Sequence, residues 1–144
     1  MLVSQSDNIV IDSVKITGVP YFSFALWKEA SHITIQNCIV KGNDTIGVIG
    51  NAGKEGYVSQ GKSTGIFDCR YNNRNDGNRY YSNIIEDVTL GIDITSGKNI
   101  IINGNTIKCL LSGIQCTDSQ NILLSNNNVI NRYAAEGNGT GIFI

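Results

Sequence analysis

The sequence repeats itself at a spacing of 22 residues. Residues 99–102 (Asn-Ile-Ile-Ile) recur as residues 121–124 (Asn-Ile-Leu-Leu), and residues 91–95 (Gly-Ile-Asp-Ile-Thr) recur as residues 113–117 (Gly-Ile-Gln-Cys-Thr). A fixed repeat of this length is typical of solenoid proteins, in which each unit stacks on the next to complete a shared core. This spacing therefore constrains the fold more than any other feature of the chain.

Each repeat reads as three short strands joined by tight turns. A Gly-Ile strand is followed by an Asn-Ile strand, whose earlier copies stand at residues 8–11 and 32–35, and then by a third strand such as residues 14–16. Apolar residues alternate with polar ones, so one face of each strand should point into the core. Three further asparagines share the 22-residue spacing and should form a ladder of amide hydrogen bonds from coil to coil: Asn83, Asn105 and Asn127.

The order Gly-Ile-x-Ile, Asn-Ile-x-Ile and an Asn-bearing turn resembles the repeats of right-handed β-helix proteins such as pectate lyases, polygalacturonases and phage tailspikes. The resemblance runs from Asn8 to Ile144 and is weakest between Gly42 and Asn78. We therefore predict an all-β fold, a right-handed parallel β-helix solenoid with about five to six coils of roughly 22 residues and three short strands per coil. Residues 1–144 should form one such domain or a fragment of one, with loop excursions within 42–78. An ordinary β-sandwich or β-roll with coincidental similarity is the alternative.

Composition agrees with short strands and tight turns. The chain has 16 glycines and one proline, and it is rich in isoleucine and asparagine. β-Branched residues favour strands, while glycine and asparagine favour turns. No sustained helical period appears, so long helices are not expected.

The resemblance implies that ligands lie along the outer face of the Gly-Ile strands. Alternation places there Ala25 or Trp27, Phe67, Asp93, Gln115 and Phe143, and the preceding connections add Glu86, Asp87, Arg132, Tyr133 and Glu136. Aromatic faces stack on sugar rings, and amides and carboxylates bond to hydroxyl groups, so a polysaccharide is the expected ligand. The candidate carbohydrate-binding residues are Trp27, Phe67, Gln115, Arg132, Tyr133 and Phe143.

Glycosidic cleavage usually needs two carboxylates about 5 to 10 Å apart. Neighbouring coils stack about 4.8 Å apart, so carboxylates on adjacent coils could meet this distance. Asp93 is the first catalytic candidate, with Asp68, Glu86 or Glu136 as its partner. Asp68 falls on a nominally inward position, so either the register shifts there or the residue is structural.

The chemistry stays open at this point. The Asn-Thr-Asp, Asp-Asp, Gly-His-Gly and Arg-Ile-Lys signatures of polygalacturonases are absent. A polysaccharide lyase would need a base and a cation that stabilises an acidic sugar, for which Arg70 and Arg132 are the candidates. Two functions remain: an extracellular or virion-surface β-helix that binds or cleaves polysaccharide, like a tailspike or depolymerase, and a non-enzymatic structural or adhesive stalk.

Other ligand classes receive little support. A formal net charge of −1 leaves no basic stripe for nucleic acid, and the apolar runs are too short to cross a bilayer. Residues 56–63 match the letters of a phosphate-binding loop but lack the strand before it and the helix after it. The four cysteines and His32 lack metal-ligand spacing, so we expect neither a metal nor another cofactor.

Two further expectations concern surfaces. An anion-attracting lip could form from Arg70, Tyr71, Arg74, Arg79, Tyr80 and Tyr81. The first repeat begins close to Met1, and the sequence stops at Ile144 within a strand that should line the core. Because terminal coils expose strand edges and an apolar interior, we expect them to be covered by the rest of a longer chain or by partner subunits, as in a homotrimer.

Overall fold

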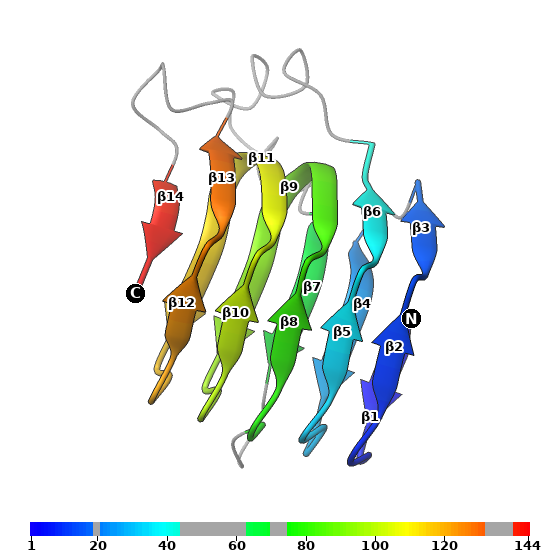
Figure 1. Ribbon diagram of the computed structural model, residues 1–144, viewed down its shortest axis with the longest axis vertical. Helices are drawn as coiled ribbons and strands as arrows, with labels where there is room; N and C mark the ends of the chain where they lie inside the picture. Colours follow the sequence, from blue (N-terminus) through cyan, green and yellow to red (C-terminus); the bar gives the residue numbers. More distant parts are fainter. Residues whose placement is uncertain (19–20, 44–62, 70–74, 132–139) are drawn as a thin grey trace.

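The computed structural model describes residues 1–18, 21–43, 63–69, 75–131 and 140–144. These residues form parallel strands that stack in three rows around one core (Figure 1). Among them there is no helix with the length and apolar character needed to span a membrane. The solenoid predicted from the repeat is therefore the observed architecture.

The first row contains the Gly-Ile strands and two strands that pair in the same row but lack this dipeptide, β1 (Leu2–Ser4) and β4 (Phe22–Trp27). The Gly-Ile strands are β7 (Thr64–Cys69), the second halves of β9 (Ile84–Thr95) and β11 (Thr106–Thr117), and β14 (Thr140–Phe143). The second row is β2 (Val10–Asp12), β5 (Thr34–Gln36), β8 (Arg79–Tyr81), β10 (Ile101–Asn103) and β12 (Leu123–Ser125). The third row is β3 (Lys15–Thr17), β6 (Ile39–Lys41), the first halves of β9 and β11, and β13 (Asn128–Asn131). The expected order of strands within a coil is thus observed.

The prediction differs from the structure in two details. The five stacked strands of the second row span about four turns, so the expected five to six coils are slightly too many. In addition, β9 and β11 are single strands of 12 residues that continue from the third row into the first. Irregular register near Cys109 lets these strands bend around the corner of the coil, because a β-bulge increases local bending.

The core is built from columns of isoleucine and other apolar side chains. Ile92 pairs with Ile114 on the next coil, as the 22-residue spacing predicts, and both are fully buried. In the second row Ile101 pairs with Leu123, which places Ile100 one coil from Ile122. Burial of one such side chain contributes about 1.5 to 3 kcal/mol, so the repeated columns are a main source of stability.

The predicted asparagine ladder is also present. The Nδ2 atom of Asn83 donates to Oδ1 of Asn105 at 2.9 Å, and Nδ2 of Asn105 donates to Oδ1 of Asn127 at 3.0 Å. The ladder follows a turn whose residues have positive φ angles, such as 51° at Ser82 and 52° at Asn126. The amides thus satisfy buried backbone groups that the turn leaves without strand partners.

Candidate functional site

The outer face of the first row carries one continuous column of side chains. In register from coil to coil this column, here called the outer ladder, contains Leu2, Ala25, Phe67, Asp93, Gln115 and Phe143. The structure therefore brings together the outward residues that alternation selected. Coils in a parallel stack are about 4.8 Å apart, so successive members of the ladder can contact one extended ligand.

Three aromatic rings meet near the middle of the outer ladder. The ring of Phe67 stacks on that of Phe22 with centroids 4.4 Å apart and lies 6.0 Å from the ring of Trp27. These three residues are called the aromatic cluster below. Phe22 was not among the predicted binding residues, although its position at the start of an aromatic-rich repeat strand was an available signal. Half-exposed stacked rings offer an apolar face of the kind that sugar rings cover.

Asp93 and Gln115 continue the outer ladder beyond the aromatic cluster. Asp93 pairs with Phe67 on one side and with Gln115 on the other, and both polar side chains are half-buried. Burial, with a smaller effect from the Asp93 charge, raises the pKa of the neighbouring Cys116 thiol to about 11. At this spacing the carboxylate can accept a hydrogen bond from one ligand hydroxyl group, and the amide can donate to or accept from the next hydroxyl group.

Asp68 lies in the core and does not share the outer face with Asp93. Its register partner is Ile94, because the alternation of β7 continues without a shift, and the Asp68 side chain has no exposed surface. Asn75 and Tyr80 donate hydrogen bonds to its carboxyl group, and Asn78 donates another at 3.0 Å. Of the two possibilities raised by the sequence, a register shift or a structural role, the position of Asp68 fits the structural role.

Burial also changes the acidity of this core network. Desolvation raises the pKa of Asp68, although the hydrogen bonds from its three partners act in the opposite direction. The pKa of Tyr80 is raised well above its usual range by burial and by the Asp68 charge. Tyr80, expected on an anion-attracting lip, is fully buried instead, because its position in β8 is equivalent to the core residues Ile35 and Ile102.

The other expected carboxylates lie away from Asp93 or outside the described residues. Glu86 is in the third-row half of β9, where its Oε1 atom pairs with Lys108 Nζ at 2.7 Å. Asp87 lies 3.8 Å from the Lys41 ammonium group. The described ranges do not include Glu136, Arg132, Tyr133, Arg70, Tyr71 or Arg74, or the phosphate-loop match up to residue 62. Loop excursions were expected within 42–78; residues 44–62 and 70–74 of this span lie outside the described ranges, and β7 occupies part of the remainder.

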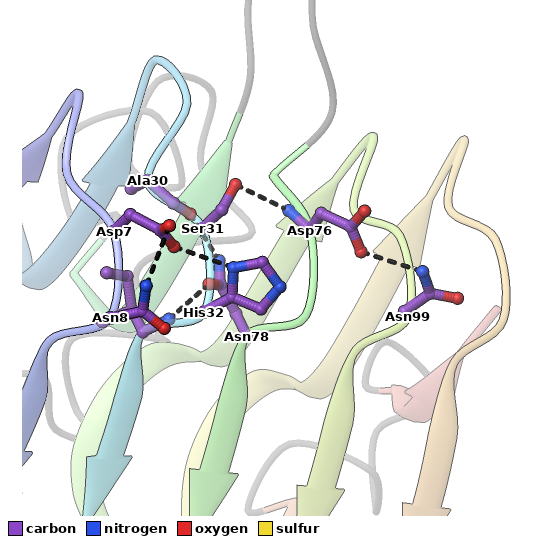
Figure 2. A network of polar contacts seen from close by, with 9 residues as sticks. Asp7, Asn8, Ala30, Ser31, His32, Asp76, Asn78 and Asn99 are labelled. Carbon is purple, nitrogen blue, oxygen red and sulfur yellow. Dashed lines mark hydrogen bonds and ion pairs between the residues drawn. The ribbon is translucent and has the colours of Figure 1, made fainter.

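A cavity of about 310 Å³ opens on the second row, on a different face from the outer ladder. Its lining is Asn8, Val10, His32, Thr34, Gly77 and Arg79. Figure 2 shows His32 at the centre of the polar network beside this cavity, with its Nδ1 atom 2.7 Å from the Asp7 carboxylate. Arg79, which was expected on an anion-attracting lip, lines this cavity, whereas Asn8, His32 and Gly77 occupy equivalent positions of the repeat and were not predicted to form a site.

Two more hydrogen bonds extend the network along the stack. The Asp76 backbone N–H donates to the Ser31 hydroxyl oxygen at 3.2 Å, and the Asn99 amide donates to the Asp76 carboxylate at 2.8 Å (Figure 2). Within the described ranges, no three His, Cys, Asp or Glu side chains gather closely enough to hold a metal ion. The network instead orders the turns that border the cavity.

Comparison with known proteins bears on the architecture. Searches of curated proteins and of solved structures give no significant match. The family model described as a right-handed β-helix region matches residues 1–144. Together with the parallel three-row stack, this match shows that the chain belongs to the right-handed β-helix family.

Proposed function

We propose that the outer ladder and the aromatic cluster bind a polysaccharide in an extracellular setting, such as the surface of a cell or a virion. The observation that carries the proposal is the contact among Phe22, Phe67 and Trp27. The polar group of Asp93 lies on the next coil of the same ladder, and that of Gln115 lies one coil further. A polymer of sugars repeats apolar ring faces and hydroxyl groups along its length. A column of aromatic and polar side chains at constant spacing complements that pattern.

Cleavage of the bound polymer is a narrower version of the same proposal. Asp93 is the carboxylate of the outer ladder that would act, and hydrolysis would need a second carboxyl group nearby. Asp68 is buried and Glu86 is paired with Lys108, so Glu136 is the remaining partner candidate. Hydrolysis would be supported if the wild-type chain releases reducing sugar from the polymer, and if Asp93→Asn still binds the polymer but no longer releases sugar.

The binding proposal can be tested by electrophoresis through gels that contain xylan, polygalacturonate or hyaluronate. We expect at least one polymer to retard the wild-type chain. Phe67→Ala should weaken this binding about tenfold or more, because loss of about 1.4 kcal/mol of stacking corresponds to a tenfold change in affinity. Thermal melts of each variant show whether the fold is retained.

Tyr81→Ala is the matched control, because Tyr81 is a half-buried aromatic residue of the second row. This variant should be retarded like the wild type. Absence of retardation in all three polymers, or equal losses in Phe67→Ala and Tyr81→Ala, would contradict the proposal. A structural or adhesive stalk would then be the better description of the chain.

A further inference from the structure

The cavity on the second row is built from two sets of equivalent repeat positions. Strands β2, β5 and β8 pair in register, which aligns Val10, Thr34 and Arg79 on their outer face. The turn before each strand contributes Asn8, His32 and Gly77, and these three residues have positive φ angles of 57°, 51° and 68°. The strands thus form the floor of the cavity and the turns form one wall.

His32 is held in place from two sides. Its Nδ1 atom lies 2.7 Å from Asp7, and a Cβ atom at Gly77 would come within 2.6 Å of the His32 ring. The absence of a side chain at Gly77 therefore makes room for the imidazole to pack against the next coil. With Asp7 at Nδ1, the Nε2 atom on the far side of the ring remains for a hydrogen bond with a ligand.

Arg79 supplies a positive charge whose counter-ion is missing among the described residues. No hydrogen bond or ion pair joins its guanidinium group to any of them. Its neighbours in the outer column are Thr34 on one coil and Ile101 on the other, and neither is charged. A guanidinium group presents donors in a planar fork that matches both oxygens of a carboxylate.

We propose that this cavity binds a small monocarboxylate that carries hydroxyl groups, such as a sugar acid. The carboxylate would bind Arg79, while the Thr34 hydroxyl, the Asn8 amide and His32 Nε2 would bond to ligand hydroxyls, and Val10 would contact a ring face. The volume of about 310 Å³ is near the lower end of ligand sites, which suits one such unit.

The surrounding charges limit the negative charge that a ligand bound to Arg79 can carry. Asp7 and Asp76 carry carboxylates on the turns beside the cavity, whereas Arg79 is the permanent cation of its lining. A dianion such as a phosphate monoester would be repelled more strongly by these carboxylates than a monoanion. This site lies on a different row from the aromatic cluster, so it is independent of the function proposed above.

The test is an NMR titration of the whole chain with glucuronate, glucose, acetate and glucose 1-phosphate. Glucuronate should give saturable shifts centred on Arg79, His32 and Thr34, and the other three compounds should bind at least tenfold more weakly. Arg79→Gln should weaken glucuronate binding at least tenfold. Lys15→Gln removes an exposed charge of the third row and should leave glucuronate binding unchanged.

Several outcomes would overturn the proposal. These are no saturable response to glucuronate, equal binding of glucose, tighter binding of glucose 1-phosphate, or equal effects of Arg79→Gln and Lys15→Gln. Phe67→Ala separates this site from the outer ladder, because it should weaken polymer binding about tenfold or more and leave glucuronate binding intact. A variant that loses both would show that the two sites are not independent.

Discussion

At the scale of single residues, one buried carboxyl group distinguishes the coil that begins with β7 from its neighbours. The column of Asp68 contains Leu26 on the preceding coil and Ile94 on the following one, and all three side chains are fully buried. A buried carboxyl group is tolerated only when donors surround it, and Tyr80 is one of three that do so here. Because that network must form as a unit, it should fix the arrangement of this coil.

The first prediction concerns the pH dependence that Asp68 adds to stability. Its folded-state pKa is raised by burial, so its contribution is greatest below the unfolded pKa of about 3.9 and is lost as the pH rises through the folded value. Wild-type stability should therefore fall, relative to Asp68→Asn, as the pH increases above about 4. Urea unfolding of both proteins at several pH values measures this difference.

Asp12→Asn provides a control with the opposite sign. Hydrogen bonds, the strongest from Gln36, lower the pKa of the exposed Asp12. Its contribution should be present above the unfolded pKa and should decrease as the pH falls through the folded value. If Asp68→Asn followed the same pH trend as Asp12→Asn, the proposed effect of burial on Asp68 would be wrong.

At the scale of elements, close packing requires the glycines near the start of three first-row segments, which are Gly65 of β7, Gly91 of β9 and Gly113 of β11. A Cβ atom at Gly91 would lie 2.3 Å from the carbonyl oxygen of Gly113 and 2.4 Å from Ile107 Cγ2. At Gly113 it would lie 2.1 Å from Val129 Cγ1. The third-row strand and the next coil therefore approach the same point, where a side chain would separate the coils.

The second prediction follows from these contacts. Gly91→Ala should destabilise the chain by about 3 kcal/mol, because the added methyl group meets backbone that cannot move without disturbing the stack. Gly141 occupies the equivalent position in β14, and a Cβ atom there has no neighbour within 4 Å. Gly141→Ala should change stability by less than about 1 kcal/mol.

Denaturant unfolding of the two variants measures both effects on the same scale. The comparison removes the general effect of glycine on the unfolded chain, because both substitutions reduce that chain's freedom alike. Equal free energies of unfolding for Gly91→Ala and Gly141→Ala would show that the close approach at β9 does not govern the choice of glycine.

At the scale of the whole molecule, the face beyond β11 is apolar and incompletely covered. Ile142 of β14 pairs with the buried Ile114, yet its side chain is 47% exposed. In the described residues β12 pairs with β10, and β13 and β14 pair with β11, so these strands present free edges. Exposed edges next to an apolar surface favour addition of another strand.

The third prediction is therefore that the chain self-associates through this face. Sedimentation velocity should show larger species as the concentration rises, and Ile142→Asp should shift the equilibrium towards the monomer. Leu123→Asp is the control, because Leu123 is 56% exposed but lies on the outer face of β12. A stable monomer at high concentration, or equal effects of the two substitutions, would contradict a stacking interface.

The sequence by itself determined the stacking of this protein. In a parallel solenoid the spacing of the repeat is also the register between coils, so a 22-residue period was enough to pair Ile92 with Ile114 and Asn105 with Asn127. Alternation within each strand was enough to align Phe67, Asp93 and Gln115 on one outer face. These relations are local, which is why periodicity revealed them.

Only the tertiary structure decided which columns touch one another. The contact of Phe22 with Phe67, the donors around Asp68, and the cavity between His32 and Arg79 join residues at different positions of the repeat. Such contacts depend on the angle of each turn and on the volume of each side chain, as Gly77 shows by making room for the His32 ring. The repeat specifies the order of the coils, whereas side-chain packing across the turns creates the sites.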